Sequence, residues 1–306
     1  MRLIWAAPAL LAAVLSSCAK PPTTPVPPPA APPLYPVNAG KSAHPDRITF
    51  LLPGALTTTE IFRPAQNWAG PDHLVVEYRL PGMQGEPLLP RLDILRSATW
   101  VADFANRHPE ASIQLLGYST GAAIAIEAAG RIDNSERVKV AAVSSATPFP
   151  GAALAALRGS LDVATSALML GSLDRQKVWE DYYKTLYFGK GWRNSAEKRQ
   201  RARQLDAIVS GRVLAPGGGV GKAQSASLLF WTPSKAALST RADIRFFHGE
   251  SDPVFPAASA RRLADRLNAE ICILPEAGHL VLQSVPGLVD RIGRYFSGEV
   301  ASGTCG

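Results

Sequence analysis

Residues 113–130 read Ile-Gln-Leu-Leu-Gly-Tyr-Ser-Thr-Gly-Ala-Ala-Ile-Ala-Ile-Glu-Ala-Ala-Gly, and Ser119 lies between Gly117 and Gly121. An apolar strand leads into Gly-x-Ser-x-Gly, and an alanine-rich helix follows it. This context exposes a serine hydroxyl at the carboxyl end of a sheet. Glycines are needed on both sides because the strand and helix backbones approach closely at the turn, where a Cβ would collide. The stretch therefore predicts Ser119 as a nucleophile on a strained elbow.

Asp252 and His279 each follow a short apolar stretch that reads as a buried strand. A serine hydroxyl needs a base to take its proton, and the imidazole of His279 suits that task. Asp252 would fix the imidazole tautomer and stabilise the imidazolium. Glu250 and Glu276 are weaker candidates for the acid, and Asp252 would also suit a simple turn before a proline. The order along the chain is nucleophile, acid, base.

The elbow, the stretch from His248 to Asp252 (His-Gly-Glu-Ser-Asp) and the pair Gly278-His279 resemble the α/β-hydrolase superfamily, in its capped esterase, lipase and peptidase-like branch. The resemblance covers roughly residues 46–297. It implies an α/β fold with a mostly parallel sheet of about six strands and helices on both faces. It also implies a helical cap inserted after the strand at 138–144.

Apolar segments that alternate with helical ones favour the same architecture, because such a sheet is covered on both faces. Too little folded chain precedes Ile48 for the two opening strands of the full family sheet. We expect strands over 48–52, 74–78, 113–116, 138–144, 244–247 and 271–274, and helices over 89–107, 122–130, 257–268 and 288–296.

The segment of about a hundred residues before the strand at 244 is expected to be the cap, over about 148–240. Asp174 is suited to cap a helix with an aromatic stripe that includes Trp179 and Tyr183. These two residues and Tyr118 are candidates for the substrate pocket, and packing of the cap onto the core is the alternative.

Ser195 begins a second predicted cap helix, whose basic residues form either a solvated face or a contact with anionic lipid headgroups or an acidic substrate. These residues are Lys198, Arg199, Arg201 and Arg203. The glycine-rich run 216–223 lacks the first glycine and the closing Ser/Thr of a phosphate-binding loop. We therefore expect a cap loop there.

The oxyanion of the reaction needs two backbone N–H donors. The residue after the nucleophile, Thr120, is expected to give one of them. The loop after the strand at 48–52 reads Pro53-Gly54, where family members usually have His-Gly. The second donor is therefore expected from Ala55 or Leu56.

Residues 1–17 read as a bacterial lipoprotein signal peptide, because a basic start and about a dozen apolar residues end in Leu-Ser-Ser before Cys18. The alternative is an ordinary secretory signal. Residues 18–46 would be the acylated cysteine and a semi-rigid tether, since residues 20–46 hold ten prolines. The hydrolase domain would span 47–306. This predicts a lipid anchor at Cys18 in a bacterial cell envelope, at the outer membrane if the cell is Gram-negative, with a periplasmic or extracellular domain.

In such an oxidising compartment Cys272 and Cys305 could form a disulfide, although Cys272 also suits a buried strand position. The sequence gives no Cys/His cluster with metal-ligand spacing, so we expect neither a metal nor a cofactor. The net charge of +7 is modest and no nucleic-acid-binding signature accompanies it. His44, His73 and His108 lie at polar segment edges and are expected on the surface, whereas His248 is expected beside the acid loop.

Together these features predict a lipid-anchored serine hydrolase, EC 3.1.1, that cleaves a carboxylic ester of a small molecule through an acyl-enzyme. A thioesterase, or a peptidase or amidase with the same triad, is the alternative within the mechanism. A non-catalytic lipoprotein that binds a ligand with the same fold is the alternative from another class. The acyl and alcohol specificity and the oligomeric state stay open.

Overall fold

The structure is a computed structural model that describes residues 31–38, 44–209, 215, 217–299 and 305. The predicted signal peptide, Cys18 and most of the predicted tether lie outside the described residues. All elements discussed below belong to the unit formed by residues 32–306.

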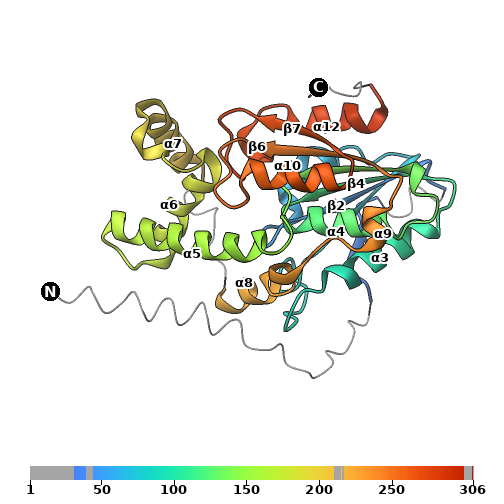
Figure 1. The fold of residues 1–306 in the computed structure, drawn as a ribbon, viewed down its shortest axis with the longest axis horizontal. Helices are drawn as coiled ribbons and strands as arrows, with labels where there is room; N and C mark the ends of the chain where they lie inside the picture. The colour runs from blue at the N-terminus through green and yellow to red at the C-terminus, as the bar shows by residue number, and fades with distance from the viewer. Residues whose placement is uncertain (1–30, 39–43, 210–214, 216, 300–304, 306) are drawn as a thin grey trace. The chain divides into compact units, whose positions relative to one another are not determined.

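A seven-stranded sheet forms the centre of this unit (Figure 1). Its spatial order is β1-β3-β2-β4-β5-β6-β7, and all neighbours are parallel except β1 and β3. The strands are β1 Leu34–Pro36, β2 Arg47–Leu52, β3 His73–Tyr78, β4 Ser112–Tyr118, β5 Val138–Val143, β6 Asp243–Gly249 and β7 Glu270–Leu274. The six strands predicted from the sequence are confirmed to within two residues.

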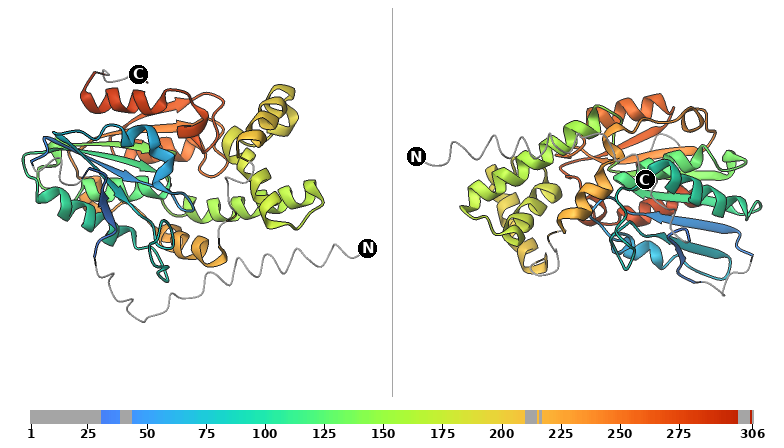
Figure 2. Two further views of the ribbon diagram at one scale, coloured as in Figure 1. Left: turned by 180° about the vertical axis from the view of Figure 1, so that it is seen from behind. Right: turned by 90° about the horizontal axis from the view of Figure 1, so that it is seen from below.

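Helices cover both faces of the sheet (Figure 2). Successive residues of a strand face opposite sides of the sheet, and each side has its own hydrophobic cluster. In β2, for example, Phe50 belongs to one cluster and Leu51 to the other. One cluster packs against α3 Ile94–Asn106, α4 Thr120–Ala129, α9 Lys235–Leu238 and α10 Ala257–Arg266. The other packs against α2 Arg63–Gln66, α11 Val281–Ser284 and α12 Leu288–Ser297. A 3₁₀ turn, η2 Thr59–Phe62, leads into α2, and a second, η3 Ser135–Arg137, precedes β5.

The chain between β5 and α9 forms the helical cap (Figure 1). Its elements are α5 Gly151–Leu170, α6 Arg175–Phe188, η4 Trp192–Asn194, α7 Ala196–Val209, α8 Gly218–Ser225 and η5 Leu228–Phe230. As predicted, the Asp174 side chain caps α6 by accepting the backbone N–H groups of Gln176 and Lys177. Ser195 caps α7 in the same way through the Lys198 N–H.

The short strand β1 departs from the expected six strands, and it arises within the predicted tether. Proline is tolerated here because β1 is an edge strand, where one side needs no donor. Leu34 packs against the core, and the Tyr35 hydroxyl donates to Glu86 at 2.5 Å. These contacts tie residues 34–36 to the sheet, so the sheet has seven strands and three residues of the predicted tether belong to it.

The glycine-rich run was expected as a loop, yet residues 218–225 form α8. Tertiary contacts hold this helix where propensity would not. The Leu92 N–H donates to the Ala223 carbonyl at 2.7 Å. Ala223 and Gln224 are buried, so the last turn of α8 is part of the packed structure.

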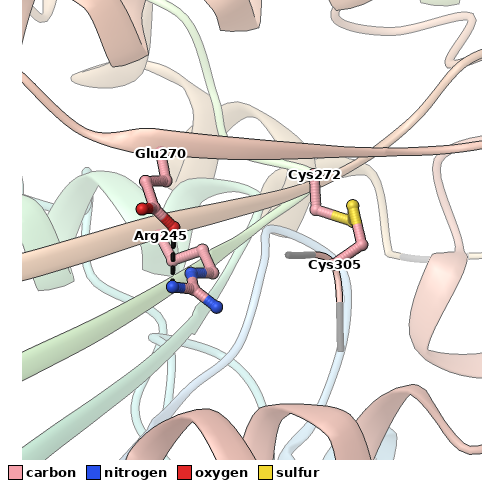
Figure 3. Close-up of a disulfide and its surroundings, with 4 residues drawn as sticks. All are labelled: Arg245, Glu270, Cys272 and Cys305. Atoms are coloured by element: carbon pink, nitrogen blue, oxygen red, sulfur yellow. Dashed lines mark ion pairs between the residues drawn. A yellow bond between two sulfur atoms is a disulfide. The ribbon is translucent and has the colours of Figure 1, made fainter. Parts of the chain in front are cut away.

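A disulfide joins Cys272 of β7 to Cys305 near the end of the chain, with the two Cα atoms 5.3 Å apart (Figure 3). Cys272 is also a buried residue of the strand. It therefore has both features considered from the sequence, the disulfide and the buried strand position. Arg245 and Glu270 form an ion pair at 2.6 Å on the neighbouring strands (Figure 3). The disulfide joins residues 33 positions apart, so it restricts the unfolded chain and links Cys305 to the sheet.

His73 is buried, contrary to the surface position expected from its polar neighbours. Its Nε2–H donates to the Thr49 hydroxyl at 2.7 Å, and that hydroxyl donates to Gln114 Oε1. Burial removes hydration from the imidazolium and, with the charge of Arg47, lowers the pKa of His73 to about 4. The imidazole is therefore neutral in the folded protein at pH 7.

We expect the free energy of unfolding to fall as the pH drops from about 6.5 towards 4. In this window His73 is protonated in the unfolded chain but stays neutral in the folded one. This difference lowers the free energy of unfolding by up to about 1.4 kcal/mol per pH unit. Urea denaturation at several pH values should show a smaller slope in His73→Gln. The exposed His44→Gln is the control, and an unchanged slope in His73→Gln would contradict the assignment.

Candidate active site

Ser119 lies between β4 and α4 with φ 53° and ψ −115°, a strained conformation for a residue with a side chain. The glycines on either side fit the steric prediction. A Cβ on Gly117 would lie 2.6 Å from the Ala122 Cα, and one on Gly121 would lie 1.9 Å from the Leu52 carbonyl oxygen. Larger residues at both positions would force the strand, the elbow and the helix apart.

Ser119, Asp252 and His279 lie together at the carboxyl end of the sheet, and all three are buried. His279 Nε2 is 3.2 Å from the Ser119 Oγ, and its Nδ1 is 2.7 Å from Asp252 Oδ2. A carboxylate only accepts hydrogen bonds, so the proton of a neutral imidazole belongs on Nδ1. The Nε2 lone pair then faces the serine hydroxyl, as a general base requires.

The carboxylate of Asp252 is fixed by the backbone of its own loop. Oδ1 accepts the N–H groups of Val254 at 2.8 Å and Phe255 at 2.9 Å, which leaves Oδ2 for His279. Burial raises the pKa of Asp252, but His279, His248 and the Phe255 amide together hold that pKa below its ordinary value. The group therefore stays a carboxylate at neutral pH.

His248 lies behind the acid, as its position at the end of a strand predicted. Its Nε2–H donates to the Phe255 carbonyl at 2.7 Å, and the same atom is 3.4 Å from Asp252 Oδ2. Burial lowers the pKa of His248, so the ring is neutral. Its contacts support the loop of Asp252 and do not reach Ser119.

The loop of His279 is held from two sides. The end of α6 accepts three of its backbone N–H groups: those of His279 at 2.6 Å and Leu280 at 3.1 Å on the Leu186 carbonyl, and that of Gly278 at 3.2 Å on the Tyr187 carbonyl. On the other side, the hydroxyl of Ser144, the residue after β5, donates to the His279 carbonyl at 2.7 Å. The cap therefore positions the base directly, a role that no sequence pattern signalled.

The loop that follows β2 lies against the nucleophile. A Cβ added to Gly54 would be 2.8 Å from the Ser119 Cβ. The Leu56 N–H donates to Gln224 Oε1 at 2.7 Å, whereas the Ala55 N–H makes no hydrogen bond to another described residue. The Thr120 N–H, in the first turn of α4, is likewise unpaired within the described part of the chain. Of the two residues left open by the sequence, Ala55 thus has the available amide.

Gln224 is a residue that the sequence analysis missed. Its side chain is fully buried, and its Nε2 donates to the Pro81 carbonyl at 2.7 Å while its Oε1 holds Leu56. Leu56 has φ 63°, a left-handed conformation that needs outside support. No local signal marks Gln224, because it directly follows the glycine-rich run and acts through residues that are distant in the sequence.

The three predicted pocket residues have different surroundings. The ring of Tyr118 is buried and lies 5.3 Å from that of His279, centre to centre. The Tyr183 hydroxyl donates to Gln283 Oε1 at 2.5 Å, which supports the packing alternative. The Trp179 ring contacts that of Tyr182, with ring centres 5.5 Å apart. Among the residues that the structure covers, no group of three His, Cys, Asp or Glu side chains could hold a metal ion.

Comparison with solved structures shows the same fold in bacterial hydrolases. A hydrolase from Pseudomonas aeruginosa PA01 is 17% identical with a TM-score of 0.60, over 87% of this chain and 93% of that one. The esterase EaEST from Exiguobacterium antarcticum is 15% identical with a TM-score of 0.58, over 83% and 93%. A thermophilic esterase from Thermogutta terrifontis is 18% identical with a TM-score of 0.56, over 83% and 90%. Identities this low show the shared fold alone.

None of the curated proteins compared with the chain matches its sequence. The sequence profile of the alpha/beta hydrolase family does match, over residues 49–291. This range contains the parallel part of the sheet except for the first two residues of β2, and it includes the elbow, the cap and the loops of Asp252 and His279. The chain belongs to the alpha/beta hydrolase family.

Proposed function

We propose that the protein is a serine hydrolase that cleaves a carboxylic ester through an acyl-enzyme on Ser119. The observation that carries the proposal is the chain of hydrogen bonds from Ser119 through His279 to Asp252. The strained elbow and the buried carboxylate add to it. Each of these features suits acyl transfer.

In the proposed mechanism the Ser119 Oγ attacks the ester carbonyl while its proton passes to His279 Nε2. Asp252 stabilises the imidazolium, and the amides of Thr120 and Ala55 donate to the oxyanion. The tetrahedral intermediate collapses, and the alkoxide leaves with the proton from Nε2. Water then attacks the acyl-enzyme with His279 as base, which releases the acid and restores Ser119.

An ester is proposed because the two named esterases share the fold and because alcohols are easier leaving groups than amines. A thioester, or a small amide or peptide, suits the same groups and is the second candidate. A non-catalytic binding lipoprotein is the alternative from another class. It would keep the fold without an activated serine.

A fluorophosphonate probe with peptide mapping by mass spectrometry tests the proposal. Labelling of Ser119 in the parent and its absence in His279→Ala would show an activated nucleophile. A screen of p-nitrophenyl esters of increasing chain length would then define the acyl group. No labelling of a folded, monodisperse sample would overturn the proposal and favour the binding-protein alternative.

Gln224→Leu should lower kcat by on the order of tenfold, less than the 10²–10³ loss that follows outright removal of an oxyanion donor. The change removes the acceptor of the Leu56 N–H and the donor to Pro81, so the loop that holds the Ala55 amide loses its support. Steady-state kinetics of the parent and the variant should separate kcat from KM.

A purely structural role of Gln224 would lower the melting temperature of Gln224→Leu while the kcat of the folded fraction stayed at the parent value. Gln224→Glu is the matched variant. It keeps the acceptor for Leu56 and should retain more of kcat than Gln224→Leu. Equal kcat in both variants and the parent would contradict a role in positioning the loop.

We also propose that Cys18 is acylated and fastens the protein to a bacterial membrane, at the outer membrane if the cell is Gram-negative. The Leu-Ser-Ser-Cys sequence supports this, and the Cys272–Cys305 disulfide is typical of an oxidising compartment outside the cytosol. Several acyl chains on one residue give stable anchoring where a single chain does not.

Cys18→Ser should make membrane association of the protein sensitive to salt without changing turnover of a soluble ester. An acyl anchor is apolar and resists washing, whereas contacts between charges are screened at about 1 M salt. Fractionation with a high-salt wash measures the membrane association. Metabolic labelling with a fatty acid shows whether the protein is acylated. Retention of the fatty-acid label in Cys18→Ser would refute the anchor.

A further inference from the structure

Helix α5 of the cap exposes a row of leucines. Leu154, Leu157, Leu161 and Leu168 are between 37% and 68% exposed. Their spacings of three, four and seven residues place them on one face of the helix. At 1.5 Å per residue the row is about 20 Å long.

The opposite face of α5 holds the helix to the protein through small residues. Ala152, Ala155 and Ser166 are buried, and Gly159 allows the Tyr182 hydroxyl to approach closely. A surface helix normally buries its leucines and exposes its small and polar residues. In α5 this order is reversed.

Two aromatic rings add to the exposed apolar surface next to α5. Phe149 precedes the helix and stacks on Phe230 of η5, with ring centres 6.1 Å apart. Both rings are more than half exposed. We define the apolar strip as Phe149, Leu154, Leu157, Leu161, Leu168 and Phe230. A contiguous exposed surface of this kind marks a binding surface for a protein or a membrane.

The net positive charge of the protein is carried by the same part of the chain. Residues 148–240 carry 13 Lys and Arg against 6 Asp and Glu, a net charge of +7. The other 213 residues carry 19 of each, so the cap accounts for the net charge of the whole chain. Lys177, Arg199 and Arg203 are among its exposed cations.

We propose that the cap docks on an anionic phospholipid bilayer through the apolar strip, with α5 lying in the plane of the interface. Leucine and phenylalanine side chains would enter the boundary between headgroups and acyl chains, and the cationic cap would be attracted by the headgroups. The proposal concerns binding alone and does not require an active Ser119.

The charges of α5 favour a helix that lies on the bilayer over one that crosses it. Among the described residues, α5 is the one helix long and apolar enough to span a membrane, with a mean hydropathy of 1.3. Yet Arg158 and Asp162 lie near its middle, and Asp162 pairs with Lys190 at 3.3 Å. A second copy of the chain is disfavoured as the occupant, because it would bring two caps of net charge +7 together.

The test uses the full chain with Cys18→Ser, so that no acyl anchor contributes. A fluorophore sensitive to polarity is attached at Leu161→Cys on α5, and at Leu95→Cys on α3 in a matched control. Leu95 is also an exposed leucine, and α3 lies well away from α5 (Figures 1 and 2). Because both proteins keep residues 1–30, the label reports where α5 lies whatever those residues do.

Vesicles of phosphatidylglycerol and phosphatidylcholine should shift the emission of the Leu161 label to the blue and leave the Leu95 label unchanged. With vesicles of pure phosphatidylcholine, or at high salt, the lipid concentration needed for the same shift should rise by on the order of tenfold. No shift of the Leu161 label on anionic vesicles would overturn the proposal. A shift without lipid that grows with protein concentration would overturn it too and assign the strip to a second copy.

A pair of matched variants tests the strip itself. Leu154→Gln, Leu161→Gln and Leu168→Gln combined should weaken binding of the Cys18→Ser protein to the anionic vesicles by about tenfold or more. Leu88→Gln, Leu95→Gln and Leu238→Gln combined change the same number of exposed leucines outside α5 and should leave binding unchanged. Equal losses in the two triple variants would refute the assignment to α5.

Discussion

Ser119→Ala should lower the turnover of an activated ester by a factor on the order of 10⁴–10⁶ while the protein stays folded. Without the hydroxyl no acyl-enzyme forms, and His279 Nε2 has no proton to accept. The remaining rate would come from binding and the oxyanion donors alone. Single-turnover kinetics of the parent and the purified variant would give the ratio of their rates. The parent pretreated with a fluorophosphonate would measure the background hydrolysis.

The matched control is Ser145→Ala. Ser145 is also a buried serine close to the elbow, but its hydroxyl donates to the Ala146 carbonyl and forms no hydrogen bond with Ser119, Asp252 or His279. We expect less than about a tenfold change in its turnover, since it loses only a neutral hydrogen bond. If Ser119→Ala retained most of the activity, or if both variants lost activity equally, Ser119 would not be the nucleophile.

The sequence predicted the parts of the site that depend on local chemistry. The elbow was readable because its glycines, its serine and the flanking strand and helix lie within one stretch of chain around Ser119. Asp252 and His279 could be predicted because each lies in the loop that follows a strand, three residues after β6 and five residues after β7. In a parallel sheet the carboxyl ends of the strands meet at one edge, so the three side chains come together.

Other parts of the site depend on contacts between distant segments and left no local signal. Gln224 holds Leu56 from 168 residues away along the chain, and Ser144 holds the carbonyl of His279 from 135 residues away. Contacts between distant segments also explain why α8 and β1 were not predicted. The composition of α8 favours a loop, and that of β1 favours a spacer. Packing against Leu92 and pairing with β3 override that composition.

Asp252→Asn should lower turnover by on the order of 10⁴, even though the two side chains have the same shape. The backbone fixes which way the amide faces. Val254 N–H and Phe255 N–H both point at Oδ1, so the carbonyl oxygen of asparagine must occupy that position. The NH₂ group then occupies the position of Oδ2, 2.7 Å from His279 Nδ1.

An NH₂ group donates, so Nδ1 would have to accept and the imidazole proton would move to Nε2. A protonated Nε2 faces Ser119 as a donor and is unable to take its proton. NMR of the ring nitrogens would show the change of tautomer, and kcat should fall with little change in KM. Asp252→Asn keeps both backbone hydrogen bonds, so the fold should persist, whereas Asp252→Ala also removes them and is expected to destabilise the loop. A kcat for Asp252→Asn within tenfold of the parent would show that Asp252 does not orient the base, and Glu250 would become the acid to test.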